Sequence, residues 1–518
     1  MSGVTADDQR PLSFIQEENK YTAEDHYSQF SVILPAPLAA GESFTFSTTY
    51  GGLYTAGDTS YAIFSLGAPT NWYPNSYSAA NYATYDMTFH IPKELVMVAT
   101  GSKTAERTDG RFGVTEWHTD VPIRQADFNL GEFSKVDTSL AEQGVILENF
   151  ARVHAPTLTI TSNQMKRILG EAQLAITLYT DFFGPVPYKR IAVSEQSSNA
   201  HGYSERYQPG YWSTSERFFS DQPPFFGQSY AGLILTPLAS YDGASPLHLQ
   251  SYLHALDPYG IAKQWWGNAT GQNSYRDRWM FEGLAEFSAS LFLQAFYKDG
   301  SYDKFWDEEL YLLTERDAKR HRRIDEGPVT LGSRLGVFQG GFRVPTRQVS
   351  TKGAYIFNMI RMLMWSNETQ DAGFKKLMHD FVQTYTNRPA TTEDFKAAVE
   401  QHMTPTMNLT GDGKMDWFFN EYLDGTALPH ERFTYSFSKT PDGTPILNFK
   451  IEQSRVDSSF HMAIPVYVKQ ADGGVLRVAS VPLTGNTAFE NQIVLGDMKG
   501  KPKSAMINYY HDVLCTQN

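Results

Sequence analysis

Hydrophobic and polar positions repeat with two different periods along this chain, and the first part has the shorter period. Between about residue 28 and residue 150, short segments alternate apolar and polar residues and are rich in β-branched and aromatic side chains, as in Ser31–Leu34, Ser43–Ser47 and Tyr85–Ile91. Glycine and proline separate these segments. Alternation with such punctuation predicts β-strands, so an all-β region is expected here.

The middle of the chain changes to a helical period. From about residue 154 to residue 425, apolar residues recur at every third or fourth position, as at Ile168, Ala172, Ala175, Leu178 and Phe182. This spacing predicts a helix over 163–183. Helix-length patterns recur at 246–267, 279–297, 302–318, 352–366, 371–386 and 392–402.

Strand-like alternation returns after Thr434, at 447–451, 463–468 and 476–479, with frequent glycine. A small β-sandwich is the natural expectation for this part. A length of 518 residues is also typical of about three domains. We therefore predict a multidomain α+β chain with an N-terminal β domain over 1–153, a mainly helical domain over 154–430 and a C-terminal β-sandwich over 431–518.

The composition excludes several classes of protein. Hydrophobic residues make up 41% and charged residues 19%, as in a globular protein with a large core. A formal net charge of -13 is the reverse of the basic footprint of nucleic-acid binding, so no nucleic-acid partner is expected. The single cysteine, Cys515, excludes an intramolecular disulfide and a multi-cysteine metal site.

Two membrane-related features are not expected. The first eight residues, Met-Ser-Gly-Val-Thr-Ala-Asp-Asp, lack a basic region followed by an apolar core, so they do not predict a signal peptide. No segment approaches the ~20 consecutive apolar residues that a membrane-spanning helix needs. The sequence itself leaves the compartment undetermined.

Two neighbouring segments carry the most specific motif. Residues 259–268 read Tyr-Gly-Ile-Ala-Lys-Gln-Trp-Trp-Gly-Asn, and residues 282–286 read Glu-Gly-Leu-Ala-Glu. They resemble the zinc-binding region of the gluzincin aminopeptidases, peptidase family M1, the relatives of membrane alanyl aminopeptidase. That family reads H-E-x-x-H-Q-W-x-G-N and, after a gap of 18 residues, the glutamate of N-E-G-x-A-E. The same gap separates Lys263 from Glu282.

Further segments resemble the same family in the same order, so the resemblance covers most of the chain. They are 183–188 (its F-G-x-x-P-Y turn), 327–332, 416–419 with 425–429, and 453–466. The resemblance implies a thermolysin-like central domain and a partial saddle-like β domain before it. Relatives of this short type are often exported, which suggests an exported or periplasmic location by resemblance alone.

The residues that carry the family's chemistry differ here. Two histidines one helical turn apart hold the family's zinc, and a glutamate beside the first activates the bound water. In this chain Tyr259 occupies the first histidine position, Gly260 the general-base position and Lys263 the second histidine position. Only the third metal ligand, Glu282, is retained.

Two more positions bear on catalysis. The family places a tyrosine that stabilises the transition state two residues before a Lys-Gly pair, and Ser350 stands there, before Lys352 and Gly353. Loss of such a donor commonly lowers the rate by ~10²–10³. The nearest counterpart of the family's G-A-M-E-N loop is 202–206, so the resemblance assigns Glu205 to the amino group of a bound peptide.

A carboxylate left without its metal is costly to bury unless it is paired or protonated. We therefore hypothesise that Lys263 replaces zinc as the countercharge of Glu282; the alternative is that both side chains are partly exposed and unpaired. Because an aspartate followed by proline is typical of a helix start, Asp257 and Pro258 predict that a helix begins or kinks there.

The sequence thus favours a non-catalytic M1 aminopeptidase homologue, a pseudopeptidase with no expected cofactor, which binds a peptide or a protein partner through the former active-site cleft. The alternative is an active metallo-aminopeptidase whose zinc is held by a rebuilt site drawn from His201, Glu205, His254 and Glu282. A third possibility is a purely structural or interaction module.

Overall fold

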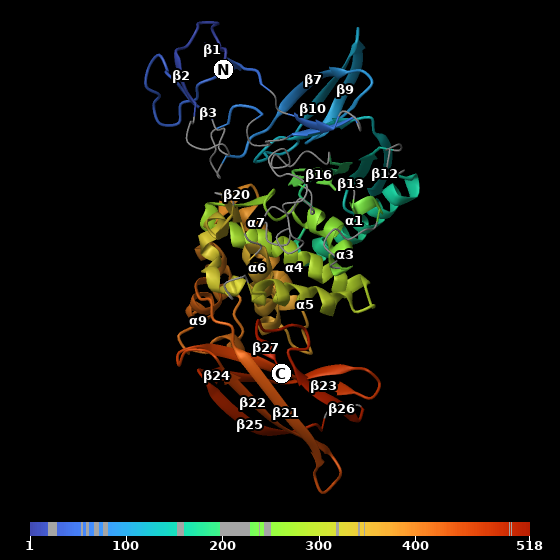
Figure 1. Ribbon diagram of the computed structural model, residues 1–518, viewed down its shortest axis with the longest axis vertical. Helices are drawn as coiled ribbons and strands as arrows, with labels where there is room; N and C mark the ends of the chain where they lie inside the picture. Colours follow the sequence, from blue (N-terminus) through green and yellow to red (C-terminus); the bar gives the residue numbers. More distant parts are fainter. Residues whose placement is uncertain are drawn as a thin grey trace.

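The computed structural model arranges the chain along one long axis, with the N-terminal strands at one end, the helices in the middle and the C-terminal strands at the other end (Figure 1). It describes residues 1–18, 28–52, 55–58, 62–66, 72–75, 81–152, 160–196, 228–237, 239–242, 250–316, 321–339, 342–345, 348–496, 498 and 500–517.

The N-terminal region consists of small sheets, as the alternating pattern predicts. Two strand pairs are β1 (Gly3–Ala6) with β4 (Phe46–Thr49), and β2 (Phe14–Glu18) with β3 (Ser28–Val32). A three-stranded sheet has the order β7 (Asp86–Pro92), β10 (Phe112–His118), β9 (Ser102–Asp109), and a four-stranded sheet has the order β5 (Thr55–Asp58), β6 (Ile63–Leu66), β11 (Phe128–Gly131), β8 (Val96–Ala99). Met97, Trp117 and Leu130 pack in the core of this region.

A five-stranded mixed sheet joins the N-terminal strands to the helices. Its order is β12 (Ser134–Leu140), β13 (Val145–Ala151), β14 (Arg190–Glu195), β16 (Leu233–Thr236), β15 (Gln228–Tyr230). β13 and β14 are parallel, and so are β14 and β16. Parallel neighbours need a crossover connection, and α1 (Ser162–Phe183) supplies the one between β13 and β14.

The predicted central helices are confirmed, with shifted ends. The helices are α1, α2 (Ala239–Asp242), α3 (Gln250–Ala262), α4 (Arg278–Phe296), α5 (Ser301–Thr314), α6 (Gln348–Met364), α7 (Ala372–Tyr385), α8 (Thr392–Gln401) and α9 (Asp416–Phe418). Short helical turns are η3 (Tyr275–Asp277), η4 (Arg323–Glu326), η5 (Val329–Arg334), η6 (Pro405–Met407) and η7 (Phe419–Asp424), and short strand pairs are β17 (Thr270–Gln272) with β20 (Arg388–Ala390) and β18 (Gly336–Gln339) with β19 (Phe342–Pro345).

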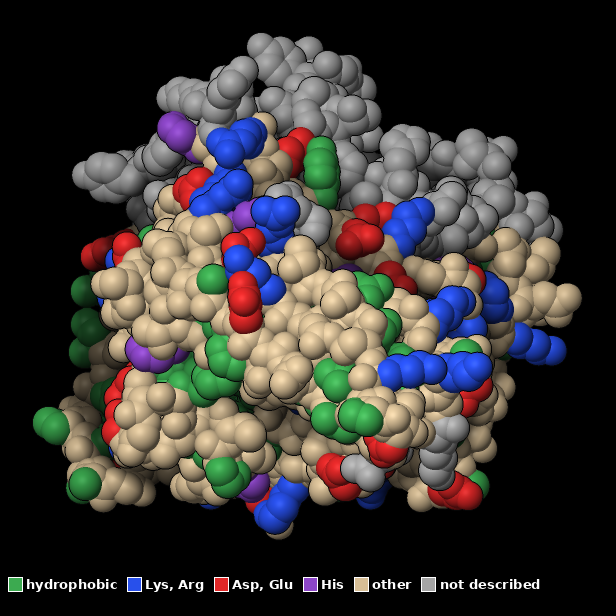
Figure 2. All heavy atoms as spheres, turned by 90° about the horizontal axis from the view of Figure 1, so that it is seen from below, with side chains coloured by type: hydrophobic (Ala, Val, Ile, Leu, Met, Phe, Trp, Pro, Cys, Tyr) green, Lys and Arg blue, Asp and Glu red, His purple; other side chains and the backbone are tan. Residues whose placement is uncertain are grey.

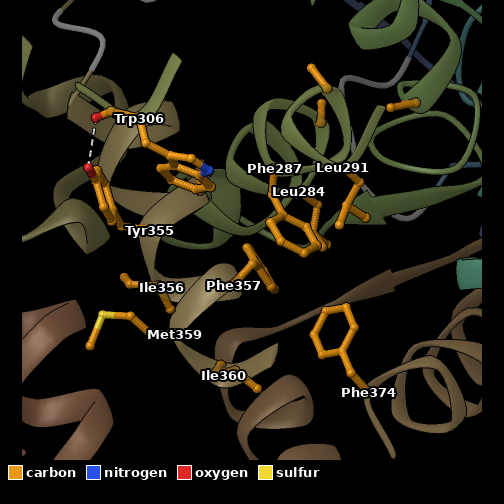
Figure 3. Packing of buried hydrophobic residues seen from close by; sticks show 14 of the residues in the cluster. Leu284, Phe287, Leu291, Trp306, Tyr355, Ile356, Phe357, Met359, Ile360 and Phe374 are labelled. Atoms are coloured by element: carbon orange, nitrogen blue, oxygen red, sulfur yellow. Dashed lines mark hydrogen bonds between the residues drawn. The ribbon is translucent and has the colours of Figure 1, made fainter. Parts of the chain in front are cut away.

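The core of the central region lies between α4, α5, α6 and α7. In Figure 3, Leu284 and Phe287 of α4 lie beside Phe357 of α6, and Trp306 lies beside Tyr355. The hydroxyl of Tyr355 donates to the carbonyl of Trp306 at 2.8 Å. The packing of α5, α6 and α7 against α4 therefore holds the residues of α4 in place.

Helices α4 and α6 cross at two glycines. A Cβ placed on Gly283 would lie 2.6 Å from the backbone of Gly353, and a Cβ on Gly353 would lie 2.7 Å from the carbonyl oxygen of Trp279. Neither helix could approach so closely with a side chain at these positions. The crossing therefore fixes the position of Glu282, the residue just before Gly283, relative to α6.

One expectation about α3 is wrong. The sequence predicts a helix start or kink at Asp257 and Pro258; the start is wrong, because α3 runs through both residues with Pro258 inside it, and the kink stays a prediction. Asp257 does not cap the helix; its carboxylate accepts from the hydroxyl of Thr236 at 3.4 Å. The packing of Leu256 and Ile261 in the core keeps the helix intact despite the proline.

The C-terminal strands form two sheets. One has the order β25 (Thr487–Val494), β22 (Pro445–Ser454), β21 (His430–Lys439), β27 (Thr516–Gln517), and the other has the order β24 (Val475–Thr484), β23 (His461–Gln470), β26 (Pro502–Ile507). Leu447 and Ile451 of the first sheet share a core with Ile464 and Val466 of the second.

The surface at this end of the molecule carries no large charge of one sign. Figure 2 shows Lys and Arg side chains interspersed with Asp and Glu, with scattered hydrophobic side chains. Within the described ranges, no helix is both long and apolar enough to cross a membrane.

Candidate functional site around Glu282

Helices α3 and α4 bring together the residues that the sequence singles out. Tyr259 lies in the last turn of α3, and Lys263 directly follows its last residue. The backbone N–H of Lys263 donates to the carbonyl of Tyr259 at 3.1 Å, so the two side chains lie one helical turn apart on the same face. That face meets Glu282 on α4. Arg278 is one turn before Glu282 on α4 and faces the same carboxylate.

Both oxygens of Glu282 have a partner. The ammonium of Lys263 donates to Oε1 at 3.0 Å, and the hydroxyl of Tyr259 donates to Oε2 at 2.9 Å. The Nε of Arg278 lies 3.9 Å from Oε1, which is an ion-pair distance and too long for a hydrogen bond. The predicted pairing of Lys263 with Glu282 is confirmed, and the alternative that the two are unpaired is wrong.

The electrostatics of the site favour the ionised carboxylate. Burial on its own would raise the pKa of Glu282, but the charges of Lys263 and Arg278 and the hydrogen bonds from Lys263 and Tyr259 outweigh it and lower the pKa to about 2. The side chains of Lys263, Arg278 and Glu282 are 15%, 16% and 20% exposed. The site is therefore a charged cluster that solvent still reaches.

The residues after Lys263 hold α3 against the five-stranded sheet. Gln264 is fully buried; it accepts from the backbone N–H of Gly232 at 2.8 Å and donates to the hydroxyl of Ser229 at 2.8 Å. Trp265 and Trp266 are also fully buried, as expected of residues that serve the core. These motif residues fix the position of Lys263.

Gly260 packs closely against strand β16. A Cβ on Gly260 would lie 3.0 Å from Cγ2 of Ile234. Any larger residue, including the glutamate of the family's motif, therefore requires Ile234 to move. Position 260 contributes no side chain to the site.

Ser350 is half-buried on α6, one turn before the Gly353 contact with α4. Lys352, two residues further, is fully buried, and its ammonium donates to the carbonyl of Gly425 at 2.6 Å. Burial lowers the pKa of Lys352 to about 7, although Asp424 acts in the opposite direction. The structure thus gives Lys352 a fixed place that the sequence did not predict.

Of the four residues of the rebuilt metal site, the structure describes two, His254 and Glu282, and these two lie apart. Glu205 and His201 lie outside the described residues, so the predicted contact of Glu205 with a peptide amino group stays a prediction. His254 stacks on Tyr297, with 4.2 Å between the ring centroids, at the far end of α4 from Glu282. In the part of the chain that the structure describes, no group of three or more His, Cys, Asp and Glu residues could hold a metal ion.

Two members of the cluster went unrecognised in the sequence. The motif identifies Tyr259 only as a replaced ligand, although a hydroxyl one turn before Lys263 can reach the same carboxylate. Arg278 stands four residues before Glu282 and directly before the predicted helix 279–297, and on a helix this spacing is typical of an ion pair. The spacing could have identified Arg278, whereas the direction of the Tyr259 hydroxyl needed the tertiary packing.

Comparison with known proteins identifies the fold. No protein-family model matches the sequence, and no curated protein matches it. The structure is similar to a mutant of the M1 zinc metallopeptidase of Deinococcus radiodurans bound to a Tyr-Ser-Ala substrate, with 18% identity over 82% of this chain and 84% of that chain and a TM-score of 0.55. The same enzyme without the mutation gives 16% identity, the same coverage and a TM-score of 0.54.

A second similar structure is aminopeptidase A of Legionella pneumophila in complex with aspartic acid, with 14% identity and a TM-score of 0.57. This match covers 100% of the present chain and 54% of the other. The chain therefore has the fold of the M1 zinc metallopeptidases, a mixed α/β fold.

Proposed function

We propose that this chain is a non-catalytic homologue of the M1 zinc metallopeptidases, in which Lys263 provides the positive charge that the metal provides in the relatives. The observation that carries the proposal is the complete engagement of Glu282 by Lys263 and Tyr259. These two donors come from the positions that the resemblance assigns to the family's zinc-binding histidines, so a metal bound to Glu282 there would have to displace them.

The residues at the remaining positions do not fit a zinc ion either. Zinc needs lone pairs from nitrogen, sulfur or oxygen, and a protonated lysine offers donors only. The phenol of Tyr259 uses its proton toward Glu282. Gly260 has no group that could act as a general base, and Ser350 stands where the family's transition-state tyrosine is expected. We derive no hydrolytic step for this site.

Under this proposal the retained fold serves binding. The former active-site region would hold a peptide or a segment of a partner protein, and the division into a partial saddle-like β domain (1–153), a thermolysin-like domain (154–430) and a β-sandwich (431–518) would be that of the family. The buried motif residues Gln264, Trp265 and Trp266 support this reading because they maintain the site's frame without acting in chemistry.

The deciding experiment measures bound zinc. Protein purified without chelators is incubated with excess zinc and desalted, and its zinc content is determined together with its turnover of aminoacyl nitroanilides. We expect no stoichiometric zinc and no turnover above that of the Glu282→Gln variant, the matched control.

Stoichiometric zinc that the Glu282→Gln variant fails to bind would contradict the proposal. It would establish the alternative, a metallo-aminopeptidase with a rebuilt site. Zinc that both proteins retain equally would place a metal away from Glu282 and would leave the assignment of this site unchanged.

A further inference from the structure

The Glu282 cluster has an excess of positive charge. Two cations, Lys263 and Arg278, face one carboxylate, at 3.0 Å and 3.9 Å. The three side chains are each at least four-fifths buried, so the remaining charge is poorly compensated by water. One further negative charge would balance these three groups.

Among the described residues, no acidic group other than Glu282 forms an ion pair with Lys263 or Arg278. Both oxygens of Asp277 are used: Oδ2 accepts from Ser274 at 2.9 Å, and Oδ1 accepts from the backbone of Thr392 at 2.8 Å. Glu286, one turn beyond Glu282, is buried in the core of α4. A third cation, Arg124, donates to the carbonyl of Gly267 at 3.1 Å, and the Lys263 ammonium lies 3.4 Å from where a Cβ of Gly267 would stand.

The cluster also has donors to spare. An ammonium carries three N–H donors, and Lys263 uses one of them toward Glu282. The guanidinium of Arg278 carries five, and none of them makes a hydrogen bond to any residue that the structure describes. A guanidinium that is mostly buried and has no acceptor at hydrogen-bond distance is prepared for an anionic ligand.

We propose that the site binds a carboxylate of a peptide, with Arg278 and Lys263 as its donors beside Glu282. This inference rests on the proposed function, because a zinc-loaded site would leave neither donor free. A carboxylate is the ligand of choice because its single negative charge balances the cluster and because its two oxygens suit the fork of an arginine.

The carboxylate can come from two parts of a peptide, the C-terminus or an acidic side chain. Four tripeptides separate these sources: acetyl-Ala-Ala-Ala with a free C-terminus, acetyl-Ala-Asp-Ala-amide, the neutral acetyl-Ala-Ala-Ala-amide, and Ala-Ala-Ala-amide, which has an amino group and no carboxylate. Their affinities for the full chain are measured by isothermal titration calorimetry at low ionic strength.

We expect at least one carboxylate peptide to bind more tightly than both amide peptides without a carboxylate. Arg278→Gln should weaken that binding by about tenfold, the usual order for a hydrogen bond between charged groups. Arg278→Lys should recover part of it. The matched control is Arg276→Gln, the same change at an exposed arginine two residues earlier, which should bind like the unmodified protein.

The inference is wrong if no peptide prefers a carboxylate, or if Arg278→Gln binds as the unmodified protein does while its thermal unfolding shows it to be folded. The zinc content of the same preparation separates this failure from that of the proposed function. A metal-free protein without carboxylate preference overturns this inference alone, whereas stoichiometric zinc that the Glu282→Gln variant fails to retain overturns the proposed function.

Discussion

Two glutamates removed from solvent illustrate opposite electrostatic outcomes in this molecule. Glu282 lies on α4 and accepts hydrogen bonds from Lys263 and Tyr259, and its pKa falls to about 2. Glu431 lies on β21 and is 1% exposed, and neither of its oxygens has a hydrogen-bond partner among the described residues. Burial raises the pKa of Glu431 to about 8.

The difference teaches that partners, rather than depth, decide the protonation state. Burial acts on both carboxyl groups in the same direction, toward the neutral form. Of the two, only Glu282 has nearby cations among the described residues, and they outweigh the effect of burial on its pKa. Glu421 of η7 behaves like Glu431: one oxygen accepts from the backbone of His461 at 2.8 Å, the other has no described partner, and burial raises the pKa to about 8.

Removing the Lys263 cation that pairs with Glu282 should lower the free energy of unfolding more than the other changes predicted below. Lys263→Met leaves the carboxylate with Arg278 at 3.9 Å as its remaining cation, and breaking a buried pair from one side typically costs about 3 kcal/mol or more. Urea unfolding at neutral pH measures this loss. The double variant Lys263→Met/Glu282→Met should recover part of it, because the carboxylate is gone but Arg278 loses its ion-pair partner.

The exposed pair of Lys450 and Glu452, at 2.9 Å, provides the control. Lys450→Met should change the free energy of unfolding far less than Lys263→Met does, since surface ion pairs contribute little. If Lys263→Met proves as mild as Lys450→Met, Lys263 is not the countercharge that Glu282 needs.

The second prediction concerns Glu431 and pH. Its pKa in the folded protein, about 8, is higher than the ordinary 4.5, so its contribution to stability is fully present below pH 4.5 and is lost as the pH rises through 8. Glu431→Gln removes this dependence and should stabilise the protein at pH 9 relative to the unmodified chain, by about 2 kcal/mol or more. Urea unfolding at about pH 5, 7 and 9 measures this difference in the free energy of unfolding.

Glu452→Gln on the neighbouring strand is the control, because Glu452 is partly exposed and paired with Lys450. It should leave the loss of stability between low and high pH in place. A Glu431→Gln variant with an unchanged pH profile would mean that Glu431 has a partner in solution that keeps it ionised. Glu421 titrates in the same direction, so the profile should flatten only in part.

The smallest change in the free energy of unfolding is expected for Tyr259→Phe. Tyr259→Phe removes one hydrogen bond to the ionised Glu282, which should cost about 1 kcal/mol at neutral pH in this partly exposed site. It should also raise the pKa of Glu282 from about 2 toward the ordinary 4.5. The stability that Glu282 adds above pH 4.5 and loses as the pH falls to 2 would then be smaller, so acid unfolding curves provide the test. A Tyr259→Phe curve that superimposes on that of the unmodified protein would exclude a role for this hydroxyl.

Much of the fold was accessible from the pattern of residues. The spacing of Ile168, Ala172 and Ala175 predicts α1 because an amphipathic helix buries one face, and those residues are buried in the structure. Positions around proline were harder: Pro258 predicts a break by its local chemistry, yet α3 continues through it because Leu256 and Ile261 are held in the core.

The candidate site divides in the same way. The resemblance of the sequence to the M1 family predicts which residues stand at that family's metal positions, and from it followed the prediction of the ion pair between Lys263 and Glu282. Only the tertiary structure decided that the Tyr259 hydroxyl takes the second oxygen, that Arg278 keeps unused donors, and that Gly283 and Gly353 let α4 and α6 meet. Periodicity reports which face of an element is turned inward, but a hydrogen bond depends on the distance between two elements, and packing alone sets that distance.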